Sequence, residues 1–164
     1  MGIEQLYNIG QVKTFKTTGG DGTITISAGT VLTTGSGRQS SRVQLRAFPR
    51  TLTYYWEAKG KFASNPTLGA AISLYWSHGN ATPDHDGDLG ITDAAIASTD
   101  KYSNLKQFGQ ILVDVSNTSS YMKASGICTI PALYVVLVVR NQGGQSMNDF
   151  ELTLTELIPQ TVAS

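Results

Sequence analysis

The fold is decided by the stretch Thr51-Leu-Thr-Tyr-Tyr-Trp-Glu-Ala-Lys-Gly-Lys-Phe62, in which apolar and polar side chains alternate. One face of it would carry Leu52, Tyr54, Trp56 and Ala58, and the other Thr53, Tyr55, Glu57 and Lys59. A period of two residues is typical of a β-strand with one face in a core and the other in water. The stretch therefore predicts a half-buried strand and a chain that folds around β-sheets.

The same alternation recurs on both sides of this stretch, between turns rich in glycine, proline, asparagine and serine. Further strands are predicted at residues 23–27, 42–48, 70–76, 108–115, 121–130, 133–139 and 150–156. About eight regularly spaced strands, with one short helix in a long loop, predict an all-β fold, an antiparallel β-sandwich. Eight strands with long end loops favour the jelly-roll type.

The length of 164 residues predicts a single domain that covers residues 1–164. Within it, residues 1–12 can extend as an N-terminal arm, and residues 157–164 are expected to form a C-terminal tail.

Three features of the sequence indicate which side chains form the core. Trp56 and Trp76 should both face it, from strands that could be neighbours. The strand 133–139 is apolar on both faces, so we expect either a neighbouring subunit or a loop to cover the face turned away from the core. Cys128 is the only cysteine and lies in an apolar strand, which predicts a small buried side chain and no intrachain disulfide.

The longest polar connection, residues 76–93, contains both histidines and three alternating aspartates. A connection of this length in a compact domain is usually functional or disordered. We predict an ordered surface loop that makes contacts, with the candidate contact residues His78, Asp84, His85, Asp86 and Asp88. Towards its end, residues 91–97 predict a two-turn helix that Thr92 or Asp93 would cap.

The alternating aspartates resemble the ligand spacing of a calcium loop. The pattern is incomplete, because Leu89 stands where such a loop needs glycine and Ala95 where it needs glutamate. We therefore predict no metal and no cofactor, with a partial Ca²⁺ site as the alternative. The two histidines lack the additional ligands that a transition-metal site requires.

No set of residues predicts catalysis, so the chain is not expected to be an enzyme and no catalytic residue is assigned. The carboxylates Glu57, Asp114, Glu151 and Glu156 fall on the polar faces of predicted strands, where solvation explains them without a role in sugar cleavage.

Composition excludes some partners and favours others. The 12 basic and 12 acidic side chains give a net charge of zero, and no basic run is present, which argues against nucleic acid as a partner. Charged residues make up 15% of the chain, and a net charge near zero favours association with protein partners. No apolar run reaches the roughly 18 residues of a membrane helix, so no membrane partner is predicted. The N-terminus lacks the pattern of a signal peptide, and we expect synthesis in a cytoplasm.

Several short runs together resemble the small structural proteins of tailed bacteriophages. These runs are Leu74-Tyr-Trp-Ser77, Gly87-Asp-Leu-Gly-Ile-Thr-Asp-Ala-Ala95, Leu105-Lys-Gln-Phe-Gly109, Val135-Val-Leu-Val-Val139 and Asn141-Gln-Gly-Gly144. In that group a strand ending in Tyr-Trp precedes a loop with a double glycine, and Gly87-Asp88 departs from the double glycine.

The resemblance implies a virion component, a jelly-roll decoration (cement) protein on the capsid surface, made in the host cytoplasm. Such proteins often act as trimers bound to the major capsid protein, and the group implies no catalytic residue. The alternative is a carbohydrate- or receptor-binding jelly roll of a phage fibre or lectin type. In that case exposed aromatic side chains such as Tyr54, Tyr55 or Tyr75 would stack on sugars beside a calcium-ordered loop.

Overall fold

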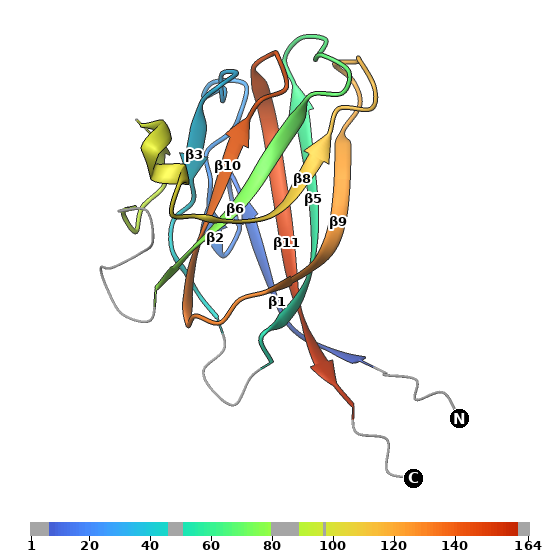
Figure 1. The fold of residues 1–164 in the computed structure, drawn as a ribbon. Helices are drawn as coiled ribbons and strands as arrows, with labels where there is room; N and C mark the ends of the chain where they lie inside the picture. Colours follow the sequence, from blue (N-terminus) through green and yellow to red (C-terminus); the bar gives the residue numbers. More distant parts are fainter. Residues whose placement is uncertain (1–6, 46–50, 80–88, 97, 161–164) are drawn as a thin grey trace.

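The computed structural model describes residues 7–45, 51–79, 89–96 and 98–160. Within these ranges the chain forms two facing β-sheets and no α-helix, and its one helical turn there is the 3-10 helix η2 (Thr99–Tyr102) (Figure 1). Nearly all strand pairs are antiparallel, the exception being β1 with β2. The prediction of an all-β sandwich built mainly from antiparallel strands is confirmed.

Each sheet combines strands that are distant in the sequence. Across the five-stranded sheet the order is β2 (Gly22–Thr23), β1 (Tyr7–Lys16), β11 (Met147–Pro159), β5 (Thr53–Phe62) and β9 (Met122–Thr129). Across the six-stranded sheet it is β7 (Ala94–Ile96), β3 (Gly37–Gln39), β10 (Tyr134–Asn141), β6 (Ala71–Gly79) and β8 (Lys106–Leu112). The short strand β4 (Val43–Gln44) completes this sheet by pairing with β10.

Aromatic side chains fill the space between the sheets. The rings of Trp76 and Phe108 stack with centroids 4.3 Å apart, and the ring of Trp56 meets Phe108 edge-on at 5.4 Å. Both tryptophans are buried, as predicted. They do not come from neighbouring strands, because β5 and β6 belong to opposite sheets. Alternation along a strand predicts which face is apolar but carries no information about the sheet that the strand joins.

Gly109 in β8 makes room for this aromatic group. A Cβ atom at position 109 would lie 2.4 Å from Cζ2 of Trp56. We expect Gly109→Ala to lower the free energy of unfolding by about 1–2 kcal/mol, because the buried indole has no space to move aside. Urea denaturation measures this, with Gly29→Ala as the control, since nothing lies within 4 Å of a Cβ there. Equal effects of the two substitutions would contradict the explanation by overpacking.

Strand β10 is buried on both faces, as its composition predicts. All side chains from Val135 to Val139 are inaccessible to solvent. Val136 and Val138 point away from the main core and pack in a second group, which we call the outer cluster: Leu89, Tyr102, Val136 and Val138, with Tyr75, Ile96 and Leu105 against them. Much of this cover therefore comes from the same chain, through Leu89, Ile96, Tyr102 and Leu105. Of the two explanations offered by the sequence, the loop is the one observed.

The helix predicted for residues 91–97 is wrong. Residues 94–96 form strand β7, which pairs with β3 through Gln39↔Ala94, Arg38↔Ala95 and Gly37↔Ile96. The helix propensity of two alanines amounts to a few tenths of a kcal/mol per residue, whereas the free edge of β3 offers backbone hydrogen bonds and the outer cluster buries part of Ile96. Tertiary contacts therefore override the local preference.

Candidate functional site

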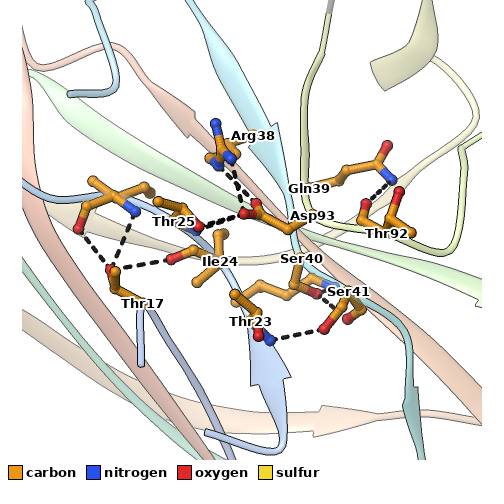
Figure 2. Close-up of polar contacts among 12 residues, drawn as sticks. Thr17, Thr23, Ile24, Thr25, Arg38, Gln39, Ser40, Ser41, Thr92 and Asp93 are labelled. Atoms are coloured by element: carbon orange, nitrogen blue, oxygen red, sulfur yellow. Dashed lines mark hydrogen bonds and ion pairs between the residues drawn. The ribbon is translucent and has the colours of Figure 1, made fainter. Parts of the chain in front are cut away.

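The segment that leads out of the predicted contact loop is fixed to strand β3 by an ion pair (Figure 2). Arg38 donates from Nε to Oδ1 of Asp93 at 2.7 Å and from Nη2 to Oδ2 at 2.8 Å. The backbone N–H and the hydroxyl of Thr25 also donate to Oδ2. The Arg38 and Asp93 side chains are only 17% and 14% exposed, so the pair is mostly shielded from water. A two-pronged Arg–carboxylate contact fixes orientation as well as distance.

Three successive carbonyl groups before Asp93 are held as well. The amide nitrogen Nε2 of Gln39 donates to the carbonyls of Gly90 at 2.9 Å and Thr92 at 2.8 Å. The backbone N–H of Arg42 donates to the carbonyl of Ile91 at 3.0 Å. Residues 90–93 are therefore a rigid anchor, and Asp93 is part of this anchor instead of a helix cap.

The protonation of Asp93 follows from these contacts. Burial raises the pKa of its carboxyl, but the hydrogen bonds from Arg38 and Thr25 outweigh burial, so that the pKa lies below the usual value of 3.8. The carboxylate is therefore ionised at neutral pH, as the ion pair requires.

Of the five predicted contact residues, His78 is the one within the described ranges. It lies in β6 opposite Val135 of β10 and is half-buried. Asp84, His85, Asp86 and Asp88 lie outside the described residues, as does most of the calcium-like pattern. Among the residues that the structure describes, no three His, Cys, Asp or Glu side chains lie close enough together to hold a metal ion. Cys128 is buried, as predicted, and burial raises the pKa of its thiol to about 11.

The two ends of the described chain pair to form a second candidate site, which we call the terminal ribbon: residues 7–9 of β1 and 157–159 of β11. Tyr7 pairs with Pro159 and Ile9 with Leu157, and the ribbon projects beyond the sandwich (Figure 1). β11 pairs with β5 only as far as Glu156, and β1 pairs with β2 only at its other end. Within the described residues, no third strand lies beside the ribbon. Both strands thus continue into the regions predicted as arm and tail.

Apolar side chains are exposed on and next to the terminal ribbon. Ile9 is 75% exposed and Val12, just inside the ribbon, is 48% exposed. Exposed apolar side chains on a strand with a free edge are typical of a surface that pairs with another chain.

Glu156 lies next to the terminal ribbon, where the pairing of β11 with β5 ends. The prediction that its side chain lies on a solvated strand face is wrong. The side chain is inaccessible to solvent, because it continues the inward alternation of Phe150, Leu152 and Leu154 along β11. Its Oε2 accepts the backbone N–H of Gln11 at 3.1 Å and its Oε1 that of Thr51 at 3.3 Å. The pairing of β1 with β11 shifts at this point, between Ile9 and Val12. The carboxylate thus satisfies an N–H that the irregular pairing turns away from the ladder.

We expect Glu156→Ala to lower the free energy of unfolding by about 1–2 kcal/mol, because the N–H groups of Gln11 and Thr51 lose their acceptor. Hydrogen exchange at Gln11 should become faster, which NMR would detect at that amide. Glu156→Gln keeps one acceptor oxygen and should give a smaller effect on both measurements. Unchanged exchange at Gln11 in the alanine variant would show that the carboxylate does not hold the ribbon.

A hollow of about 420 Å³ lies on the outer face of the five-stranded sheet, and we call it the sheet groove. It crosses β11, β5 and β9, and its polar lining is Glu57, Lys59, Lys123, Ser125, Glu151 and Thr153. Lys59 and Glu151 form an ion pair of 2.9 Å on its surface. The predicted sugar-stacking tyrosines are distributed differently: Tyr54 is in the core, Tyr75 lies against Tyr102 under the loop, and only Tyr55 is on this outer face.

No protein-family model and no curated protein sequence matches the chain. No helix in the described part of the chain is long and apolar enough to cross a membrane. The function is therefore inferred from the anchor, the terminal ribbon and the sheet groove.

Proposed function

We propose that the sandwich is a jelly roll. Its eight principal strands, in chain order, are β1, β3, β5, β6, β8, β9, β10 and β11. Numbered in that order, they follow 1-8-3-6 in one sheet and 2-7-4-5 in the other. The first strand thus lies beside the last, and consecutive strands alternate between the sheets except for β6 and β8. This arrangement supports the two-Greek-key architecture that viral capsid and lectin domains share.

On this fold, we propose a non-enzymatic virion structural protein: a decoration or cement protein that binds the capsid surface and stabilises the particle. The terminal ribbon is the observation that carries the proposal. A two-stranded ribbon is only marginally stable alone in water, and its exposed apolar side chains cost free energy until a partner covers them. Strand addition by the major capsid protein would pair the free edges and bury Ile9.

The rest of the surface supports a protein partner over the other classes. A net charge of zero disfavours nucleic acid and permits close packing of copies, and we propose a trimer at a symmetry axis of the capsid. The anchor at Asp93 holds the end of the predicted contact loop against β3, which suits a loop that meets a neighbour in a fixed geometry.

The proposal is tested with purified particles. The chain should be found in the virion by mass spectrometry, and the isolated protein should bind saturably to particles that lack it. Light scattering after size-exclusion chromatography should give the mass of a trimer, either for the protein free in solution or for the protein once it has assembled. A protein that stays monomeric and has no affinity for such particles would disprove the proposed function.

A further inference from the structure

The polar lining of the sheet groove comes from two neighbouring rows of outward-facing side chains, and a third row lies beside them. Strand register places Thr153, Glu57 and Ser125 side by side across β11, β5 and β9. On one side the next row is Glu151, Lys59 and Lys123, and on the other Thr155, Tyr55 and Ile127. The hollow is therefore a property of the register, and three hydrogen-bonded strands hold its walls in place. Its volume is within the usual range of small-ligand sites, about 300–1,000 Å³.

The charges of the lining balance. Two ammonium groups, Lys59 and Lys123, and two carboxylates, Glu57 and Glu151, line the groove, and the hydroxyl residues Ser125 and Thr153 flank Glu57 in its row. A phosphate or a polyanion would meet the carboxylates, and a metal cation would meet the ammonium groups. A neutral ligand with many hydroxyl groups avoids both penalties, because each hydroxyl can donate to a carboxylate and accept from a lysine.

The surface next to the groove is apolar and aromatic, although these side chains are not part of its lining. Ile127 is 66% exposed, and Tyr55 stands next to it in the same row. At the other end, the Tyr121 ring lies 5.5 Å from Nζ of Lys59 and 5.7 Å from Nζ of Lys61, while its hydroxyl donates to Asp149. A pyranose ring has apolar C–H faces and polar hydroxyl edges, and therefore suits a polar groove with apolar and aromatic surface beside it.

We propose that the sheet groove binds a neutral oligosaccharide, with Glu57 as hydroxyl acceptor, Lys123 as donor and the adjacent Tyr55–Ile127 row as the apolar surface on which the sugar chain continues. None of these residues is in the terminal ribbon, so the inference does not depend on attachment to a capsid. It assigns to the same molecule a second, sugar-facing surface.

A glycan array of neutral, sialylated and phosphorylated oligosaccharides tests this with the full chain. Neutral glycans should bind, and the strongest of them, titrated by NMR, should shift the amide signals of Glu57, Ser125 and Thr153. Ser125→Trp fills the groove from an exposed strand position and should weaken binding at least about 10-fold. Glu57→Gln, a smaller change, should weaken it several-fold. Gln110→Trp, exposed on β8 of the other sheet, is the control and should bind as the unaltered protein does.

Three outcomes would overturn the proposal: no neutral glycan binds, sialylated or phosphorylated glycans bind better than neutral ones, or Ser125→Trp binds normally. Binding of Ser125→Trp to particles should be unchanged, which separates this result from a failure of the proposed capsid function. A melting temperature equal to that of the unaltered protein would establish that each variant is folded.

Discussion

Replacing Ile9 and Val12 together by threonine is expected to weaken binding to decoration-free particles about 100-fold. Both side chains are exposed in the isolated protein, so the substitutions cost little folding stability. At an interface both side chains would be buried, and each substitution would then remove apolar contact and introduce a hydroxyl without a hydrogen-bond partner. The two substitutions together should therefore reduce the binding free energy by about 3 kcal/mol. Threonine keeps the β-branched side chain, so the strand preference of the terminal ribbon is retained. Co-sedimentation with particles measures the affinity.

Leu68→Thr is the matched control for this experiment. Leu68 is 61% exposed, similar to Ile9, but follows β5 at the end of the sandwich opposite to the terminal ribbon. Its substitution should leave binding to particles unchanged. If the ribbon variant and the control bind equally well, the terminal ribbon is not the attachment site, and the contact must lie elsewhere on the molecule.

Replacing Asp93 by alanine is expected to lower the free energy of unfolding by about 3 kcal/mol. The substitution leaves the guanidinium of Arg38, which is mostly buried, without its carboxylate, and removes the acceptor of the Thr25 hydroxyl and N–H. Removing one partner of a buried ion pair typically lowers folding stability by about 3–5 kcal/mol. Because this ion pair is still partly exposed to water, we expect a loss at the lower end of that range. Urea denaturation followed by tryptophan fluorescence gives the value.

The double variant Arg38→Met, Asp93→Ala separates the two contributions. It removes the stranded charge, so it should recover part of the stability lost by Asp93→Ala alone. If the double variant loses, relative to the unaltered protein, as much stability as Arg38→Met and Asp93→Ala lose together, Arg38 and Asp93 are not coupled and the anchor works through its backbone hydrogen bonds instead.

The same ion pair predicts how stability depends on pH. The pKa of Asp93 is lower in the folded protein than in the unfolded chain. The carboxylate therefore contributes its full stabilisation at any pH above the unfolded-state pKa of about 4, and this contribution is lost as the pH falls through the folded-state pKa. Asp93→Asn should therefore show a smaller loss of stability on acidification than the unaltered protein. Parallel curves for the two proteins between neutral pH and pH 2 would contradict this assignment.

Sequence patterns predicted the layers of the fold because burial on one face of a strand leaves a period of two. Alternation assigned Trp56 and Trp76 to the core, and the continuous apolar run of residues 133–139 assigned β10 to a position covered on both faces. It did not predict β7, because the edge of β3 that binds Ala94–Ile96 comes from a segment more than 50 residues earlier in the chain.

The features of the candidate sites depend on information that local patterns do not contain. Glu156 was assigned to water by its residue type, although its position two residues after Leu154 puts it on the inward face. Counting positions along β11 would have found it. Arg38 and Asp93 are 55 residues apart, and the sheet groove exists only through the register of three strands. Neither of these can be derived from one strand at a time.

The pairing of β1 with β11 also constrains how the protein can be fused to other molecules. Because Tyr7 and Pro159 are paired at the outer ends of β1 and β11, a tag or cargo joined directly to either strand end would lie at the terminal ribbon and compete with the proposed capsid contact. The turn between β5 and β6 is at the other end, where Gly69 has a positive φ of 77° and the nearby Leu68 is already in water. A peptide displayed on particles through this protein therefore belongs in that turn, and both ends of the chain should be left unmodified.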